Sequence, residues 1–229
     1  MQAKSLSLSE HANRRFAWLL EQRGFDYWTE DELDSKIPVM GTRPDFYVET
    51  LRSGPFLVEV ESFEQRSVFP SVGQFDPEIS IKRMRTSVRH AARQLKPYAF
   101  LEIPMLVVLD NWRLVGIPSN VGFLRQALFG KLEFRLRLDV DKGILVGEPK
   151  LHHGIGQTLH AERKNYISAV AWNMPKQAYL YADPQEGQQM RLRVVHNDFA
   201  QRKLPIDLFS DEEDEHHGYD ENGRWQRLS

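Results

Sequence analysis

The 229-residue chain contains no cysteine, which excludes disulfide bonds and thiolate metal sites. It has no apolar run near the roughly 20 residues that a membrane-spanning helix requires. Its first ten residues are polar and unlike a secretory signal. With 41% hydrophobic residues, the chain has enough apolar side chains for a packed core. These features predict a soluble, cytoplasmic protein that has no contact with a membrane.

Several common functional motifs are also missing. Adjacent histidines occur at 152–153 and 216–217, but neighbours in sequence point in different directions, so a zinc site is not indicated. Gly154-Ile155-Gly156 lacks the following glycine and helix of a dinucleotide-binding loop. The chain also has no Gly-x-Ser-x-Gly nucleophile elbow. Zinc, dinucleotide and serine-hydrolase chemistry are therefore not indicated.

Charge is distributed unevenly along the chain. Eight acidic and two basic residues lie from Asp207 onward, which leaves 28 basic and 24 acidic residues in 1–206. A mildly basic body with an acidic tail is compatible with nucleic-acid binding. We expect one α/β domain over residues 1–206, with a core at about 10–110 and a strand-rich extension at 120–206, followed by a solvated acidic tail at 207–229.

The hydrophobic pattern predicts an α/β fold with a mixed central β-sheet flanked by helices. A first helix is expected to begin at Ser7 or Ser9 and to end at about Arg23, and further helices are expected at 78–98 and 121–129. Strands are expected at 25–28, 46–48, 56–61, 105–109, 132–138, 166–172, 178–182 and 192–195.

Three carboxylates are expected to converge at one end of this sheet. Side chains alternate faces along a strand, so Leu57, Glu59 and Glu61 point the same way. Asp45 begins the strand that is expected to pair with this one through a hairpin. Three such carboxylates suit Mg²⁺ or Mn²⁺, which activates water and stabilises charge at a phosphodiester. In the alternative interpretation, the two glutamates lie on an exposed sheet face and Asp45 is a turn residue.

The long helix predicted at 78–98 carries two further features. Near its end, Gln94 and Tyr98 are i, i+4 neighbours at the border of its apolar face. Opposite that face, basic residues spaced three and four apart form a stripe that can follow a phosphate backbone, although an ordinary solvated face has the same pattern. This basic stripe consists of Lys82, Arg85, Arg89, Arg93 and Lys96.

Two of these patterns resemble a known family. Pro44-Asp45, a hydrophobic hairpin and Val58-Glu59-Val60-Glu61 resemble the PD-(D/E)xK motif of the restriction-endonuclease-like nuclease superfamily. Gln94-Leu95-Lys96-Pro97-Tyr98 is similar to the Q-x-x-x-Y signature of RecB-type nucleases, on the helix after the core strand. The resemblance covers about residues 10–110. It implies a restriction-endonuclease-like core, extended by C-terminal strands, and a Mg²⁺-dependent phosphodiesterase that cleaves DNA.

The resemblance also implies roles for individual residues. Asp45 and Glu59 would ligate Mg²⁺ or Mn²⁺, and Glu61 would be a further ligand or the general base. Gln94 and Tyr98 would orient the substrate or the metal-bound water. The basic stripe would contact DNA.

The first helix is expected to contribute another metal-facing carboxylate. Glu10 and Glu21 are the candidates, and Asn13 lies closest to the position that the superfamily uses. We prefer Glu10, although a carboxylate at the start of a helix also serves as a cap.

One residue departs from the superfamily motif, because Glu61 stands where the motif has lysine. A third carboxylate strengthens metal binding but supplies no positive charge, and Lys82 is a candidate substitute. A second hypothesis follows, in which the fold has lost catalysis and binds nucleic acid or a partner protein. In that case the acidic residues 211–215 offer a surface for interaction with a partner, and they are also expected to cover the basic stripe. The sequence leaves open whether the chain forms a homodimer.

Overall fold

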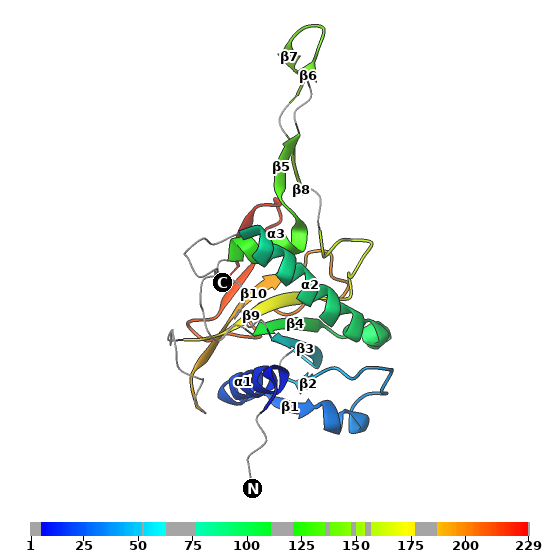
Figure 1. The fold of residues 1–229 in the computed structure, drawn as a ribbon, viewed down its shortest axis with the longest axis vertical. Coiled ribbons are helices and arrows are strands. Elements are labelled where there is room, and N and C mark those ends of the chain that lie inside the picture. The colour runs from blue at the N-terminus through cyan, green and yellow to red at the C-terminus, as the bar shows by residue number, and fades with distance from the viewer. Residues whose placement is uncertain are drawn as a thin grey trace.

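The computed structural model describes residues 6–51, 53–62, 77–110, 121–135, 138–147, 150–153, 157–176 and 187–228. An eight-stranded sheet runs through the body in the order β1-β2-β3-β4-β9-β10-β11-β12, with helices on both faces (Figure 1). Parallel and antiparallel pairs both occur, which confirms the predicted α/β fold with a mixed sheet. Among the described residues, no helix is both long and apolar enough to span a membrane.

The first half of the chain builds one edge of the sheet and its centre. β1, β2 and β3 pair antiparallel, and β3 then pairs parallel with β4. The elements in chain order are α1 (Leu8–Gln22), β1 (Asp26–Thr29), η1 (Glu30–Ser35), β2 (Phe46–Glu49), β3 (Phe56–Ser62), α2 (Pro77–Leu95), η2 (Lys96–Leu101) and β4 (Met105–Asp110).

The second half completes the sheet and adds a projecting arm. β9 pairs parallel with β4 and antiparallel with β10, and β5–β8 form two short ladders outside the main sheet. The elements are α3 (Val121–Phe129), β5 (Leu132–Arg135), β6 (Leu138–Asp139), β7 (Ile144–Leu145), β8 (Lys150–His153), β9 (Ala169–Pro175), β10 (Met190–His196), β11 (Glu215–Tyr219) and β12 (Trp225–Arg227).

The alternation of β3 divides the core into two layers. Val58 and Val60 pack with the apolar side of α1, whereas Leu57 faces the layer formed by α2 and α3. Because Glu59 and Glu61 follow Leu57 at intervals of two, they point to the α2 side. The predicted apolar stripe of α2 is buried in this layer, as expected from its helical spacing: Met84, Val88, Ala91, Ala92 and Leu95.

Local chemistry explains where the helices begin and end. Ser7 caps α1, its hydroxyl accepting from the Glu10 N–H while the Glu10 carboxylate accepts from the Ser7 N–H, so two N–H groups left free by the helix are satisfied. Beyond α1, Gly24 adopts a φ of 65°, which favours glycine. The helix predicted at 78–98 ends earlier, at Leu95, and continues as η2, because Pro97 disfavours helical backbone at Lys96.

The C-terminal segment, expected as a solvated tail, is instead part of the sheet. β11 pairs parallel with β10, and β12 closes this edge. Asp214 is buried and accepts from the Leu192 N–H at 2.7 Å. Its acidic neighbours contact cations of the body rather than the basic stripe of α2, with Arg23 3.0 Å from Asp211. Apolar periodicity does not predict this segment as a strand, because main-chain pairing with β10, rather than an apolar pattern of side chains, places β11 in the sheet.

Two other strand predictions differ in detail. The strand predicted at 132–138 covers β5 and the first residue of β6, which belong to separate ladders, and the one predicted at 166–172 begins at Ala169. The strand predicted at 178–182 lies outside the described residues.

Candidate functional site

The adjoining ends of β2 and β3 bring Asp45 and Glu59 together. Phe46 pairs with Val58 in the antiparallel ladder, so Asp45 stands beside Glu59 just before β2 begins. Asp45 Oδ2 accepts from the Val60 N–H at 2.7 Å, and Glu59 accepts from the Asp45 N–H. These reciprocal contacts with main-chain N–H groups hold the two carboxylates side by side where β2 begins.

Among the described residues, neither carboxylate of this pair has a basic partner to offset its charge. Glu59 is only 3% exposed, and burial together with the nearby Asp45 and Glu61 carboxylates raises its pKa to about 9. Burial also raises the pKa of Asp45 to about 6, against the Val60 N–H and Asn13, which lower it. Glu59 Oε2 has no hydrogen-bond partner among the described residues. A buried carboxylate beside a half-buried one requires either a proton or a cation between them.

The third predicted carboxylate contacts α2. Glu61 Oε1 lies 2.5 Å from His90 Nδ1, and this contact lowers the pKa of Glu61 against the larger raising effect of burial. The His90 side chain is 58% exposed. Sequence reasoning missed His90, although it lies one turn before Gln94 on the same helix.

Tyr98 and Gln94 differ in their surroundings. The buried Tyr98 hydroxyl donates to the Thr42 carbonyl at 3.1 Å and accepts from the Met40 N–H at 3.2 Å. It therefore fixes the loop that leads into Asp45, which is a positioning role. Gln94 Oε1 is buried and has no hydrogen-bond partner in the described part of the chain, so it keeps an acceptor available.

The first helix reaches the site through Asn13 rather than through a carboxylate. Asn13 Nδ2 donates to Asp45 Oδ1 at 2.7 Å. The carboxylates that were the sequence-based candidates on this helix have other partners, since Glu10 belongs to the capping box and Glu21 accepts from the Tyr27 hydroxyl at 2.8 Å. The structure therefore favours the capping role for Glu10.

A further acidic residue, Glu30 in η1, lies near the pair. Its charge raises the pKa of both Asp45 and Glu59. Sequence reasoning missed Glu30 because it lies in an acidic loop with no strand register to place it. Its charge makes the pair still more in need of a cation.

Four of the five basic-stripe residues are exposed, three on α2 and the last at the start of η2: Lys82, Arg89, Arg93 and Lys96. Arg85 is partly buried and donates to the Gln126 carbonyl of α3 at 3.3 Å, so it joins the two helices instead. Lys82, Arg89 and Arg93 share α2 with His90, which touches Glu61. A cationic surface thus begins close to the carboxylates.

The carboxylate pair offers two protein ligands for a metal ion. In the described ranges, no group of three or more His, Asp or Glu side chains is close enough to hold a metal ion. Mg²⁺, however, is commonly held by one or two protein carboxylates, with water and substrate phosphate completing its six ligands. Asp45 and Glu59 supply that number, and Glu59 Oε2 accepts no hydrogen bond from the part of the chain that the structure describes. The residues present therefore fit Mg²⁺ or Mn²⁺ through two protein ligands.

A second buried carboxylate, Asp110 at the end of β4, has a different environment. Arg15 forms a buried ion pair with it, its Nε lying 2.9 Å from Asp110 Oδ2. Asn173 Nδ2 donates to Oδ1 at 3.0 Å. This carboxylate faces α1, and its charge is balanced within the fold.

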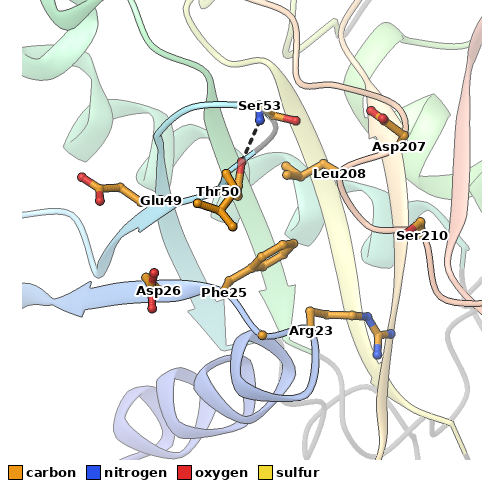
Figure 2. Close-up of a pocket in the computed structure, with 11 residues that line it drawn as sticks. Arg23, Phe25, Asp26, Glu49, Thr50, Ser53, Asp207, Leu208 and Ser210 are labelled. Atoms are coloured by element: carbon orange, nitrogen blue, oxygen red, sulfur yellow. Dashed lines mark hydrogen bonds between the residues drawn. The ribbon is translucent and has the colours of Figure 1, made fainter.

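A pocket of about 370 Å³ opens at the other end of β2 (Figure 2). Phe25 and Leu208 line it, together with Arg23, whose guanidinium pairs with Asp211 and Asp214. Asp45 precedes β2 while the pocket residues Glu49 and Thr50 follow or end it, so the pocket and the carboxylate pair lie at opposite ends of the strand. The pocket is therefore not part of the candidate site.

The fold and the site together define a mixed-sheet α/β protein with a carboxylate pair that has no cationic partner within the described ranges. No protein-family model matches the chain, and no similar curated protein was found. A solved structure, Pyrococcus furiosus SfsA in complex with Ca²⁺, is similar at 16% identity and a TM-score of 0.21, over 64% of this chain and 62% of that one. The match thus spans less than two thirds of SfsA, and a likeness at this level carries no argument about function.

Proposed function

We propose that the protein is a metal-dependent phosphodiesterase that cleaves DNA and holds Mg²⁺ through Asp45 and Glu59. The observation that supports this most is the pair itself, a half-buried Asp45 beside the buried Glu59. Two carboxylates lie side by side with raised pKa values, and one oxygen, Glu59 Oε2, has no donor among the described residues. Burying such a pair destabilises the fold unless a ligand uses it, and a divalent cation neutralises both charges at once.

The surrounding residues suit phosphodiester hydrolysis. A bound Mg²⁺ would polarise the phosphate and make a water molecule more acidic. Glu61, positioned by His90, is the group proposed to take the proton of the attacking water. Gln94, with its available amide oxygen, is proposed to orient that water or the substrate. The exposed cations of α2 would contact the phosphate backbone on either side of the cleaved bond.

Calorimetric titration of Mg²⁺ and Mn²⁺ tests the metal site. The wild type is expected to bind, and Glu59→Gln, which keeps the side-chain shape and removes the charge, is expected to lose binding. The cation must displace the proton of Glu59, whose pKa is about 9, so the heat measured at pH 7 should vary with the ionisation enthalpy of the buffer. Glu49→Gln, in the same sheet but at the far end of β2, is the matched control and should bind like the wild type.

A plasmid-nicking assay on the same variants tests catalysis. Metal-dependent nicking by the wild type and Glu49→Gln, lost in Glu59→Gln and Asp45→Asn, is the expected result. Equal nicking by wild type and Glu59→Gln would show that the assignment is wrong. Absence of metal binding in the wild type would leave the carboxylates without a catalytic role.

A second candidate function is a binding module that has lost catalysis. The contact between Glu61 and His90 favours it, because Glu61 stands where the resembling motif carries lysine, and its oxygen is already occupied at 2.5 Å. This candidate predicts metal and DNA binding without nicking. The two functions are thus separated by turnover alone.

A further inference from the structure

A short turn before β9 brings two cations close to α2. The His160 N–H donates to the Arg163 carbonyl at 3.0 Å, and the Arg163 N–H donates to the His160 carbonyl at 2.9 Å, which closes the turn. Just beyond it, the Tyr166 hydroxyl donates to the Ala92 carbonyl of α2 at 2.7 Å. Arg163 and the next residue, Lys164, are thereby held beside the helix that carries the basic stripe.

One flank of α2 faces this turn. Arg85 donates to a main-chain carbonyl of α3 at 3.3 Å, so the flank that carries Arg85 is turned toward α3. Arg89 lies one helical turn later on the same flank. The segment that leads into the turn also contacts α3, because the Thr158 N–H donates to the Leu128 carbonyl at 2.7 Å. Arg89 and the turn therefore lie on the same side of α2.

The three cations are close enough to repel one another. Partial burial lowers the pKa of Lys164, and the positive charges of Arg89 and Arg163 lower it further. Among the described residues, none of the three forms an ion pair with a carboxylate, although Glu162 is exposed in the same turn. The fold thus gathers three cations here that no described acidic group balances.

Lys164 is also held in an unfavourable backbone conformation. Its φ is 59°, in the left-handed region that glycine adopts more readily than residues with a side chain. The Ile167 N–H donates to the Lys164 carbonyl at 3.1 Å, and the Lys164 ammonium donates to the Thr158 carbonyl at 3.3 Å. These contacts fix the ammonium in place, and the described residues use one of its three N–H donors.

A phosphate group has the chemistry that relieves this repulsion. Arginine binds phosphate oxygens through paired N–H groups, and lysine binds them as a compact charge. From Arg89, exposed cations of the basic stripe continue along α2, so the positive surface is elongated. An elongated positive surface suits a nucleic-acid backbone, whose negative charges follow one another in a line.

We infer that Arg89, Arg163 and Lys164 form a phosphate-binding site for the backbone of bound DNA. Arg89 precedes His90 in sequence but leaves the helix about 100° away from it, so the site and the contact with Glu61 lie on different flanks of α2. Bound DNA then extends from the carboxylate pair across α2 to the turn. The choice of DNA as the ligand rests on the proposed function, whereas the site itself requires neither the metal nor catalysis.

Fluorescence anisotropy with labelled duplex DNA, in the presence of a chelator, tests the site without cleavage. Lys164→Gln should weaken binding a few-fold and reduce the slope of log affinity against log salt concentration by about one unit. Adding Arg163→Gln should reduce the slope by about two units in total. Lys142→Gln, which removes a charge near Asp139 in the turn between β6 and β7, is the matched control and should bind like the wild type. A double variant with the affinity and slope of the wild type, or a wild type that binds no DNA, overturns the inference.

Thermal melts separate a binding role from a structural one. Lys164→Gln removes one of three like charges, so its melting temperature should equal or exceed that of the wild type while its DNA affinity falls. A lower melting temperature together with weaker binding would indicate a structural role and contradict the inference. Binding of anionic vesicles, but not of DNA, through Arg163 and Lys164 would assign the surface to a membrane instead.

The same assay distinguishes this site from the proposed nuclease function. With a chelator present, Glu59→Gln should bind DNA as the wild type does, because the carboxylate pair takes no part in holding the backbone at the turn. Failure of the nuclease function would then appear as absent metal binding or nicking with DNA binding intact. Failure of the phosphate-binding site would appear as an unchanged double variant at the turn.

Discussion

Asp110 and Glu59 are buried carboxylates on neighbouring strands of one sheet, and their environments are opposite. Asp110 faces α1, where Arg15 and Asn173 balance it. Glu59 faces α2, where the groups around it are Asp45, Glu61 and Glu30. Asp110 thus takes part in the hydrogen bonding that stabilises the fold, whereas Glu59 raises the free energy of the folded state.

This difference separates a structural charge from a candidate functional one. Burial alone does not distinguish the two, since Asp110 is fully buried and Glu59 nearly so. The distinction comes from the partners, because a paired buried ion is tolerated while like charges held together are not. A site that keeps such a pair is expected to bind something that relieves it.

The largest effect on stability is expected from removing the cation that pairs with Asp110. Arg15→Met removes the cation and leaves Asp110 buried and unpaired, so the free energy of unfolding should fall by about 3–5 kcal/mol. Urea unfolding at pH 7 measures it. Adding Asp110→Asn to Arg15→Met should recover part of the loss, since no buried charge then remains. A loss under about 1 kcal/mol for the single variant would contradict the assigned role of the pair.

Replacing Glu59 by a neutral residue should instead increase the free energy of unfolding. The pKa of Glu59 is raised from 4.5 to about 9, so between these values the folded protein holds a proton that the unfolded chain has lost. This group therefore makes stability fall as pH rises through that window. Glu59→Gln should remove the dependence and stabilise the metal-free protein at pH 8 by roughly 1–3 kcal/mol.

Thermal melts of wild type and Glu59→Gln at pH 5 and pH 8, with a chelator present, check this prediction. The gain should be larger at pH 8 than at pH 5. Added Mg²⁺ should raise the melting temperature of the wild type only, because only the wild type keeps both carboxylates. A destabilised Glu59→Gln at pH 8 would mean that Glu59 is satisfied in the fold, like Asp110.

A smaller effect is expected from the loop that positions Asp45. Tyr98→Phe loses the contacts to Thr42 and Met40, at a cost of about 1 kcal/mol in the free energy of unfolding, and should weaken Mg²⁺ binding. Tyr166→Phe is the control, since its hydroxyl donates to the Ala92 carbonyl at 2.7 Å, away from the loop. Both variants should lose stability, but only Tyr98→Phe should lose metal affinity, as calorimetry can show.

The smallest effects are expected at the exposed cations, which contrast with the buried Arg15. Arg89→Ala and Arg93→Ala should each leave stability within about 0.5 kcal/mol of the wild type. If Arg89 and Arg93 contact phosphates, each substitution should lower DNA affinity a few-fold. It should also reduce the slope of log affinity against log salt concentration by about one unit. Fluorescence anisotropy at several salt concentrations measures both. An unchanged slope would assign these residues to an ordinary solvated face.

The sequence predicted the fold class and the close approach of Asp45 to Glu59, because strand alternation and a short hairpin leave little freedom. It did not predict which α1 side chain forms a hydrogen bond with Asp45. The choice between Asn13 and Glu10 depends on how the helix is oriented against the sheet. It also did not predict Glu30 or His90, whose places depend on loop and helix packing. The acidic C-terminal segment was misjudged because β11 enters the sheet through main-chain pairing.

By itself, the sequence determined the periodicities, and thereby the elements, their buried faces and the side of β3 from which the glutamates emerge. Only the tertiary structure decided which buried carboxylate is balanced. Asp110 and Glu59 both sit in apolar strands, but α1 carries Arg15 to the first and no cation to the second. Electrostatic balance depends on distances between elements far apart in the chain, and local sequence does not encode those distances.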